Sequence, residues 1–148
     1  MDYNIADLVP HSKTMLLVDR VISIDNDTLI SEVDIHSNSL FAEENGVPSS
    51  VGIEYMAQSI AAWAGAKDLA AGKSIKIGFL VGTRKYTSNV SHFPLNETLT
   101  VHVSEIIKGE NGLGVFECSI TSPLVEVKAS INVFQPDDVD TFLNNEQD

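Results

Sequence analysis

The sequence predicts one α+β domain in which an antiparallel sheet curls around a single long helix. The 148 residues suit one domain. Residues 51–72 form the one long apolar stretch, and its many alanines favour a helix. The stretches on either side are shorter, strand-like and separated by turn residues. We therefore expect a domain over residues 1–136, followed by an acidic, solvated tail over residues 137–148.

The chain before the helix predicts a helical turn, a hairpin and a loop. Pro10 ends the turn, because the residue before a proline disfavours the helical conformation. Asp25-Asn26-Asp27 is a turn signal between two aliphatic stretches, which predicts an antiparallel hairpin. Asp19 and Arg20 interrupt the first of these stretches and are expected to form a structural ion pair. The expected elements are a turn over residues 4–8, strands over 14–24 and 28–35, and a loop over 37–50.

The long helix is expected to begin after Ser49 or Ser50, either of which can cap its first turn. At ~1.5 Å per residue, such a helix would span about 30 Å. Because it is nearly all apolar, it needs to be wrapped by other elements. The rest of the chain predicts four more antiparallel strands, over residues 76–86, 97–108, 113–121 and 124–134.

Composition excludes several classes of function. A formal net charge of −12 argues against a partner that is itself anionic, such as nucleic acid or an acidic membrane. Cys118 is the only cysteine, so neither a disulfide framework nor a cysteine-based zinc site is expected. The chain shows no basic-then-apolar leader, and its most apolar stretch is too short to cross a bilayer. We expect a cytoplasmic protein that holds no metal and no cofactor.

Two segments of the sequence carry motifs. The first is LVPHSKTMLLVDRV, residues 8–21, and the second is EYMAQ, residues 54–58. They resemble the opening segment and the E-x-x-A-Q signature of the 3-hydroxyacyl-[acyl-carrier-protein] dehydratases, and Gly78-Phe79-Leu80 falls where that family begins its next strand. The resemblance covers roughly residues 5–135. It implies the hot-dog fold, usually paired into a dimer with active sites at the subunit interface.

The string GVPSSVGIEYMAQ, residues 46–58, most resembles a divergent branch of these dehydratases that occurs with aryl-polyene gene clusters. The sequence departs from the housekeeping enzymes at one point. They carry a catalytic histidine in an H-F-P-G loop shortly before the helix. The corresponding stretch of this sequence, residues 41–48, is shorter and contains no histidine. His92-Phe93-Pro94 occurs after the helix, and we interpret its similarity to the H-F-P-G motif as coincidence.

Dehydration requires a base for the proton next to the carbonyl and an acid for the departing hydroxyl. Glu54 is the candidate carboxylate, because an ionisable group on an otherwise apolar helix surface is costly unless it is paired or used. Gln58, one turn later, is expected to hydrogen-bond Glu54. Gly52 would let the thioester approach the backbone, and Val51 and Tyr55 are further candidates for substrate binding. The alternative is that Glu54 only favours the positive end of the helix dipole.

A histidine is expected to complete the pair. His11 is the first candidate, because it lies in the opening motif and imidazole exchanges protons near neutral pH. It could instead have only a structural role. His36, ahead of the shortened loop, is the reserve, and His102 is expected on a solvated face of a strand.

The resemblance implies an enzyme that converts a 3-hydroxyacyl thioester into a 2-enoyl thioester in fatty-acid or polyene lipid synthesis. The acyl carrier would be acyl carrier protein or coenzyme A. Arg84 and Lys85 could meet its phosphate or acidic surface, or they could simply lie at a solvated strand end. Two alternatives stay open. The chain could be a catalytically incomplete subunit that pairs with a complete hot-dog protein, or it could be an acyl thioesterase. The sequence leaves open whether it forms a homodimer or a heterodimer.

Overall fold

The structure is a computed structural model that describes residues 16–73, 79–109 and 112–134, and the side chains of residues 79–81 are not among the features described. The predicted turn over residues 4–8, the acidic tail and His11 lie outside these ranges. Eight strands and one long helix are described: β1 (Arg20–Ile24), β2 (Thr28–Asp34), β3 (Val47–Pro48), α2 (Gly52–Ala70), β4 (Phe79–Ser88), β5 (His92–Phe93), β6 (Thr98–Lys108), β7 (Leu113–Ser122) and β8 (Val125–Phe134). None of the described helices has the length and apolar character needed to cross a membrane.

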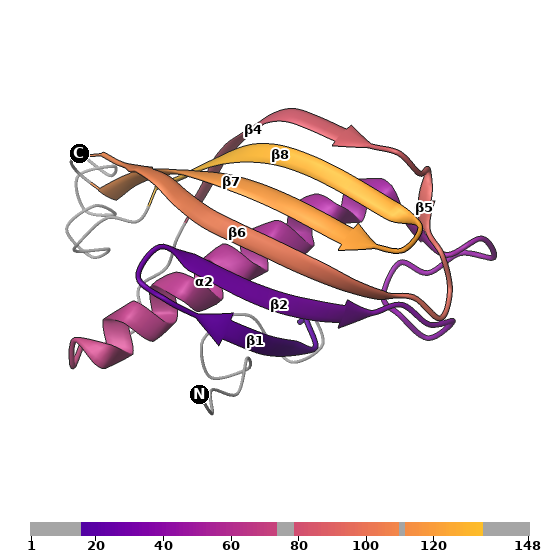
Figure 1. The fold of residues 1–148 in the computed structure, drawn as a ribbon, viewed down its shortest axis with the longest axis horizontal. Helices are drawn as coiled ribbons and strands as arrows, with labels where there is room; N and C mark the ends of the chain where they lie inside the picture. Colours follow the sequence, from indigo (N-terminus) through magenta and orange to yellow (C-terminus); the bar gives the residue numbers. More distant parts are fainter. Residues whose placement is uncertain (1–15, 74–78, 110–111, 135–148) are drawn as a thin grey trace, which may run out of the picture.

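Six strands form one antiparallel sheet in the order β1-β2-β6-β7-β8-β4. Helix α2 lies across the concave face of this sheet and packs against β2, β6 and β7 (Figure 1). The chain therefore places its first hairpin, β1 and β2, at one side of the sheet and β4 at the other. The predicted α+β layout, with a sheet around one helix, is confirmed.

The core lies between α2 and the inner face of the sheet. Alternate residues of β6 and β7 are buried, as expected for strands that are covered on one face only. Trp63 of the helix packs edge-on against Phe116 of β7 with ring centroids 5.3 Å apart, and its indole N–H donates to the Asp25 carbonyl. Each such large apolar side chain stabilises the fold by about 1.5–3 kcal/mol. The helix is held mainly by this burial.

The predicted strand bounds agree with the structure to within a few residues, except in the first strand. That strand begins at Arg20, whereas the aliphatic run predicted residue 14. The reason is a contact with the helix: the Gln58 side-chain oxygen accepts the N–H groups of Leu17 and Val18, at 2.8 and 3.3 Å. Residues 16–18 consequently follow the helix and do not join the sheet.

A second, two-stranded sheet was missed by the sequence reading. In it Val47 pairs with Phe93, and Pro48 pairs with His92. Gly46 makes this pairing possible, because its φ of 119° and its close approach to the Phe93 carbonyl leave no room for a side chain. The segment before the helix is thus tied to a segment that follows β4.

The predicted ion pair between Asp19 and Arg20 is wrong. Arg20 instead forms ion pairs across the hairpin with Glu32, at 2.7 Å, and with Asp34, at 2.8 Å. Asp19 accepts the backbone N–H of Asp34 at 2.7 Å. Neighbouring residues on a strand point to opposite faces, so partners on the adjacent strand are better placed than the next residue in the chain.

The Arg20–Asp34 pair predicts a small loss of stability in acid. Hydrogen bonds from Arg20 lower the pKa of Asp34 from 3.8 to about 2, so its ionised form stabilises the folded state. This contribution is complete above the unfolded pKa and is lost as pH falls through 3.8 toward 2. It should stay below about 1 kcal/mol, since the Asp34 side chain is 40% exposed.

Urea unfolding should therefore show Asp34→Asn less stable than the wild type near neutral pH, with the two converging as pH approaches the lowered pKa. Asp27→Asn is the control, because Asp27 lies on the same hairpin without an ion pair among the described residues. A gap of the same size at both pH values would contradict the assignment.

Candidate active site

The start of helix α2 is fixed by backbone contacts. A 3-10 turn, η2 (Ser49–Val51), precedes the helix, and the N–H of Gly52 bonds to the carbonyls of Ser49 and Ser50. The Ser49 carbonyl also accepts the Tyr86 hydroxyl, and the Ser49 N–H donates to the Ser91 carbonyl at 2.9 Å. The prediction that a serine side chain caps the helix is wrong, because the cap position is Val51 and no side chain bonds there.

Gly52 has a packing role at this start. A β-carbon on Gly52 would lie 3.0 Å from Ile120, 3.1 Å from the Phe93 ring and closer still to the Tyr86 hydroxyl. The helix can therefore reach the core only with glycine here. Its predicted contact with the thioester stays a prediction, and its N–H is already bonded within the chain.

Glu54 stands in the first turn of α2 and is exposed. The expectation of a carboxylate seated in apolar surroundings is wrong for this chain by itself, because Glu54 lies on the side of the helix that the sheet leaves uncovered. Among the described residues its carboxylate has no hydrogen bond and no ion pair. Glu54 is consequently a free carboxylate on a rigid helix turn, at the positive end of the helix dipole.

Gln58 does not bond Glu54, contrary to the prediction. Its side chain is 2% exposed, and its oxygen accepts the two N–H groups of Leu17 and Val18. Helix geometry explains the difference: residues four apart share a face, but the segment at residues 16–18 covers Gln58 and leaves Glu54 outside. Gln58 therefore anchors the opening segment of the domain to the helix that carries Glu54.

Truncation of Gln58 should destabilise the fold strongly. Gln58→Ala would leave two backbone N–H groups without their acceptor and open a cavity, for a loss of about 2–4 kcal/mol. Urea unfolding measures this loss, and hydrogen exchange at the amides of Leu17 and Val18 should accelerate beyond the global effect. Glu54→Ala is the matched control, one turn earlier and exposed, with an expected change within about 0.5 kcal/mol. Equal losses in both variants would contradict this anchoring role.

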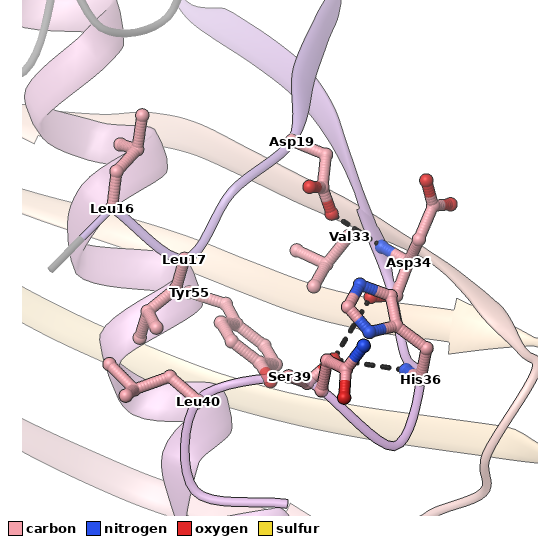
Figure 2. Close-up of a pocket in the computed structure, with 10 residues that line it drawn as sticks. Leu16, Leu17, Asp19, Val33, Asp34, His36, Ser39, Leu40 and Tyr55 are labelled. Atoms are coloured by element: carbon pink, nitrogen blue, oxygen red, sulfur yellow. Dashed lines mark hydrogen bonds between the residues drawn. The ribbon is translucent and has the colours of Figure 1, made fainter. Parts of the chain in front are cut away.

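Tyr55 faces the interior of the domain, unlike the exposed Glu54 beside it, and is 2% exposed. Val51 is half-buried and packs against the core. Tyr55 also lines a pocket of about 300 Å³. We call this the Tyr55 pocket, and its lining residues are Leu16, Leu17, Asp19, Val33, Asp34, His36, Asn38, Ser39, Leu40 and Tyr55. Figure 2 shows the Tyr55 ring reaching from the helix toward the loop that carries His36 and Ser39.

The described histidines lie in three places. His36 is exposed and lines the Tyr55 pocket. His102 lies on the outer face of β6, half-buried, as the alternation of its strand predicted. His92 lies beside Pro48, directly before the helix, so the chain brings it closer to the helix start than its position in the sequence suggests. His11 lies outside the described residues.

His92 links the segment before the helix to β5 through side chains as well as backbone. Its Nε2 lies 2.8 Å from a Glu43 oxygen, and its Nδ1 lies 3.0 Å from the Ser91 hydroxyl. The shortened stretch over residues 41–48 contains no histidine, but the contact of Glu43 brings His92 next to it. No local pattern marks this pairing, since 49 residues separate Glu43 from His92.

Two further predicted features can be placed. Arg84 and Lys85 are exposed on β4, the edge strand, where the pairing with β8 shifts register. Lys85 has a positive φ of 55°, which marks a bulge in that edge. Within residues 16–73, 79–109 and 112–134, no cluster of three or more histidine, cysteine or acidic side chains could hold a metal ion.

Comparison with known families and structures gives a consistent result. A family model described as ApeP dehydratase, of the ApeP-like type, matches residues 3–144. No curated protein sequence matches the chain. The dehydratase heterocomplex ApeI:P from Xenorhabdus doucetiae contains a chain with 23% identity and a TM-score of 0.86, with 97% of each chain covered.

Two proteins solved with coenzyme A or acetyl CoA share the fold at lower similarity. A hypothetical thioesterase from Streptococcus pneumoniae TIGR4, solved with coenzyme A, has 14% identity and a TM-score of 0.58, with 78% of this chain and 84% of that chain covered. The protein smu.793 from Streptococcus mutans UA159, bound to acetyl CoA, has 14% identity and a TM-score of 0.60, with 86% and 94% covered. These likenesses confirm the predicted hot-dog fold.

Proposed function

The chain belongs to the ApeP-like dehydratase family, and from this premise we propose that Glu54 is the carboxylate that removes the substrate's proton. The reaction is the dehydration of a 3-hydroxyacyl thioester, as the sequence predicted. The family fixes the class of reaction, whereas the roles of individual residues, the acyl carrier and the partner subunit belong to this proposal.

In the proposed reaction, Glu54 takes the proton from the carbon next to the thioester carbonyl. The electron pair of that C–H bond forms the new double bond, and the C–O bond to the 3-hydroxyl breaks. A histidine donates a proton to the departing oxygen, so that water leaves and a 2-enoyl thioester remains. Net proton balance is kept, because the proton on Glu54 then returns to the histidine through solvent.

The observation that carries this proposal is the state of Glu54. An exposed carboxylate without a partner among the described residues is available to a substrate. The turn beneath it is held by the Gly52 N–H and by the Tyr86 and Ser91 contacts to Ser49, so the backbone of Glu54 is fixed in position. Positioning of this kind is what general base catalysis requires.

We propose His11 as the proton donor in this chain. The supporting observation is indirect: Leu17 and Val18, which belong to the same sequence motif as His11, are bonded to Gln58, one helical turn after Glu54. His36 is the reserve candidate. His11→Ala and His36→Ala, each assayed by the loss of one water from a 3-hydroxyacyl-carrier substrate, separate the two, since only the donor's variant should lose activity.

The same proposal assigns the substrate's carrier and its contacts. Acyl carrier protein is the proposed carrier, with coenzyme A as the alternative, and exposed Arg84 and Lys85 suit its anionic groups. Val51, Tyr55, Gly52 and Gln58 remain candidates for substrate contact around the helix start. A cytoplasmic site for the reaction fits the free thiol of Cys118.

A second candidate is a subunit that completes its active site with another hot-dog protein. Four observations favour it. Glu54 has no histidine partner in the described part of the chain, and the outer edge of β4 is unpaired there. The half-exposed side of α2 carries small residues, which suit close packing against another subunit. The similar ApeI:P protein is itself a heterocomplex.

One experiment distinguishes the two candidates. The purified chain is assayed alone and after mixing with a second hot-dog dehydratase subunit, with mass spectrometry to detect the loss of water and a thiol reagent to detect hydrolysis. Turnover by the isolated chain supports the self-sufficient enzyme. Activity that needs both subunits, and that Glu54→Gln abolishes in the mixture, supports the composite site. Thiol release without dehydration would overturn both and favour the predicted alternative, a thioesterase.

A further inference from the structure

The hydroxyl of Tyr55 has no hydrogen-bond partner among the described residues, although its side chain is almost fully buried. A buried hydroxyl without a partner costs free energy. Every fully enclosed side-chain nitrogen or oxygen in the described part of the chain does have a partner, so the Tyr55 oxygen must touch open space. The open space that Tyr55 lines is the Tyr55 pocket.

Three other polar side chains of the pocket form hydrogen bonds within the protein, whereas the side chains of His36 and Asn38 form none among the described residues. Asp34 accepts hydrogen bonds from Arg20 and Thr98. Asp19 accepts the Asp34 N–H, and the Ser39 hydroxyl accepts the His36 N–H at 2.9 Å (Figure 2). The Tyr55 hydroxyl is thus a donor whose position is fixed by a buried ring and whose proton is not used within the described chain.

The surroundings define what this donor can bind. Burial raises the pKa of Tyr55, and the charge of Asp19 raises it further, so the phenol stays neutral and donates a hydrogen bond. The apolar lining comes from Leu16, Leu17 and Leu40 together with Val33. The carboxylates of Asp19 and Asp34 disfavour an anion, and the four aliphatic side chains favour a ligand that has an apolar part.

We propose that the Tyr55 pocket binds a small, neutral molecule that presents one hydroxyl or carbonyl oxygen to the Tyr55 hydroxyl and an apolar part to the aliphatic side chains of the pocket. A volume of about 300 Å³ is at the lower limit for small-molecule sites and fits a compact ligand. Such a ligand could be part of the substrate's acyl chain or a separate small molecule. The site does not rest on the proposed function, because binding can be measured without turnover.

Benzyl alcohol and toluene test this proposal, because they are similar in size and only the alcohol carries an oxygen. An apolar pocket without a hydrogen-bond donor would prefer toluene, since burial of an unpaired hydroxyl is unfavourable. With the donor present, benzyl alcohol should bind about threefold to tenfold more tightly than toluene, the effect of one net hydrogen bond. Amide chemical shifts of the ¹⁵N-labelled full chain, followed at the pocket residues, give both affinities.

Tyr55→Phe should remove the preference for the alcohol while leaving toluene binding in place. Tyr86→Phe is the matched control, because it removes a hydroxyl outside the pocket and should keep the preference. Leu40→Trp provides a second test that does not touch the core: Leu40 is 41% exposed at the pocket rim, and tryptophan there should weaken both ligands at least tenfold. Toluene binding as tightly as the alcohol in the wild type, or an alcohol preference that survives Tyr55→Phe, would overturn the proposal.

A competition experiment then identifies the source of the ligand. A 3-hydroxyacyl pantetheine thioester is added to the complex with benzyl alcohol, using Glu54→Gln so that no turnover occurs. Displacement of the alcohol identifies the occupant as the acyl chain, whereas simultaneous binding identifies a separate ligand. The benzyl alcohol and toluene affinities are measured without any substrate, so a failure of the proposed catalytic role of Glu54 would leave them unchanged.

Discussion

Glu54→Gln should lower the rate of dehydration by about 100-fold or more while leaving the fold intact. Loss of a general base typically costs 10²–10⁴-fold in rate, and the amide cannot accept the substrate's proton at neutral pH. The stability should change by less than about 0.5 kcal/mol, because Glu54 is exposed and has no partner among the described residues. The measurement is mass spectrometric loss of water from a 3-hydroxyacyl-carrier substrate, with urea unfolding of the same preparations.

Glu44→Gln is the control for Glu54→Gln. Glu44 is an exposed carboxylate in the stretch just before the helix, so its variant makes the same change in charge a few residues away. It should retain full activity. If Glu54→Gln retained activity as well, in the isolated chain and in any mixture with a partner subunit, Glu54 would be a helix-dipole residue without a catalytic role.

The fold was predictable because its signals are local and repeated. Period-two alternation marks β6 and β7, and the alanine-rich run marks α2, so short windows of sequence identify these elements. The first strand was overextended because the aliphatic run before Arg20 reads the same whether it joins a sheet or follows a helix. Only the distant oxygen of Gln58 decides between the two.

The site was predictable in part. The position of Glu54 on the first helical turn follows from local pattern, but its exposure does not, because that depends on which side of α2 the sheet covers. The pairing of His92 with Pro48 joins segments 44 residues apart, and no local signal marks it. The free hydroxyl of Tyr55 could not be predicted for the same reason. The sequence shows that a tyrosine is present, but whether its hydroxyl has a hydrogen-bond partner depends on the tertiary structure.

Gly52→Ala should destabilise the fold by about 1–3 kcal/mol, although alanine is the better helix former by about 1 kcal/mol. The added methyl group would lie 3.0 Å from Ile120 and 3.1 Å from Phe93, and would displace the Tyr86 hydroxyl from its bond to Ser49. The helix start would have to shift, so activity should fall together with stability. Urea unfolding and the dehydration assay measure the two effects.

A double-mutant cycle separates this steric cause from a general effect of replacing glycine. Tyr86→Phe removes the atom nearest to the new methyl group, so Gly52→Ala should cost less in that background than in the wild type. Gly82→Ala is the matched single control, because nothing lies within 4 Å of its β-carbon position. If Gly52→Ala cost no more than Gly82→Ala, or if Tyr86→Phe gave no relief, the packing of the helix start would not depend on Gly52. The fixed position of Glu54 would then need another source, because the contacts around Gly52 and Ser49 are what hold its turn in place.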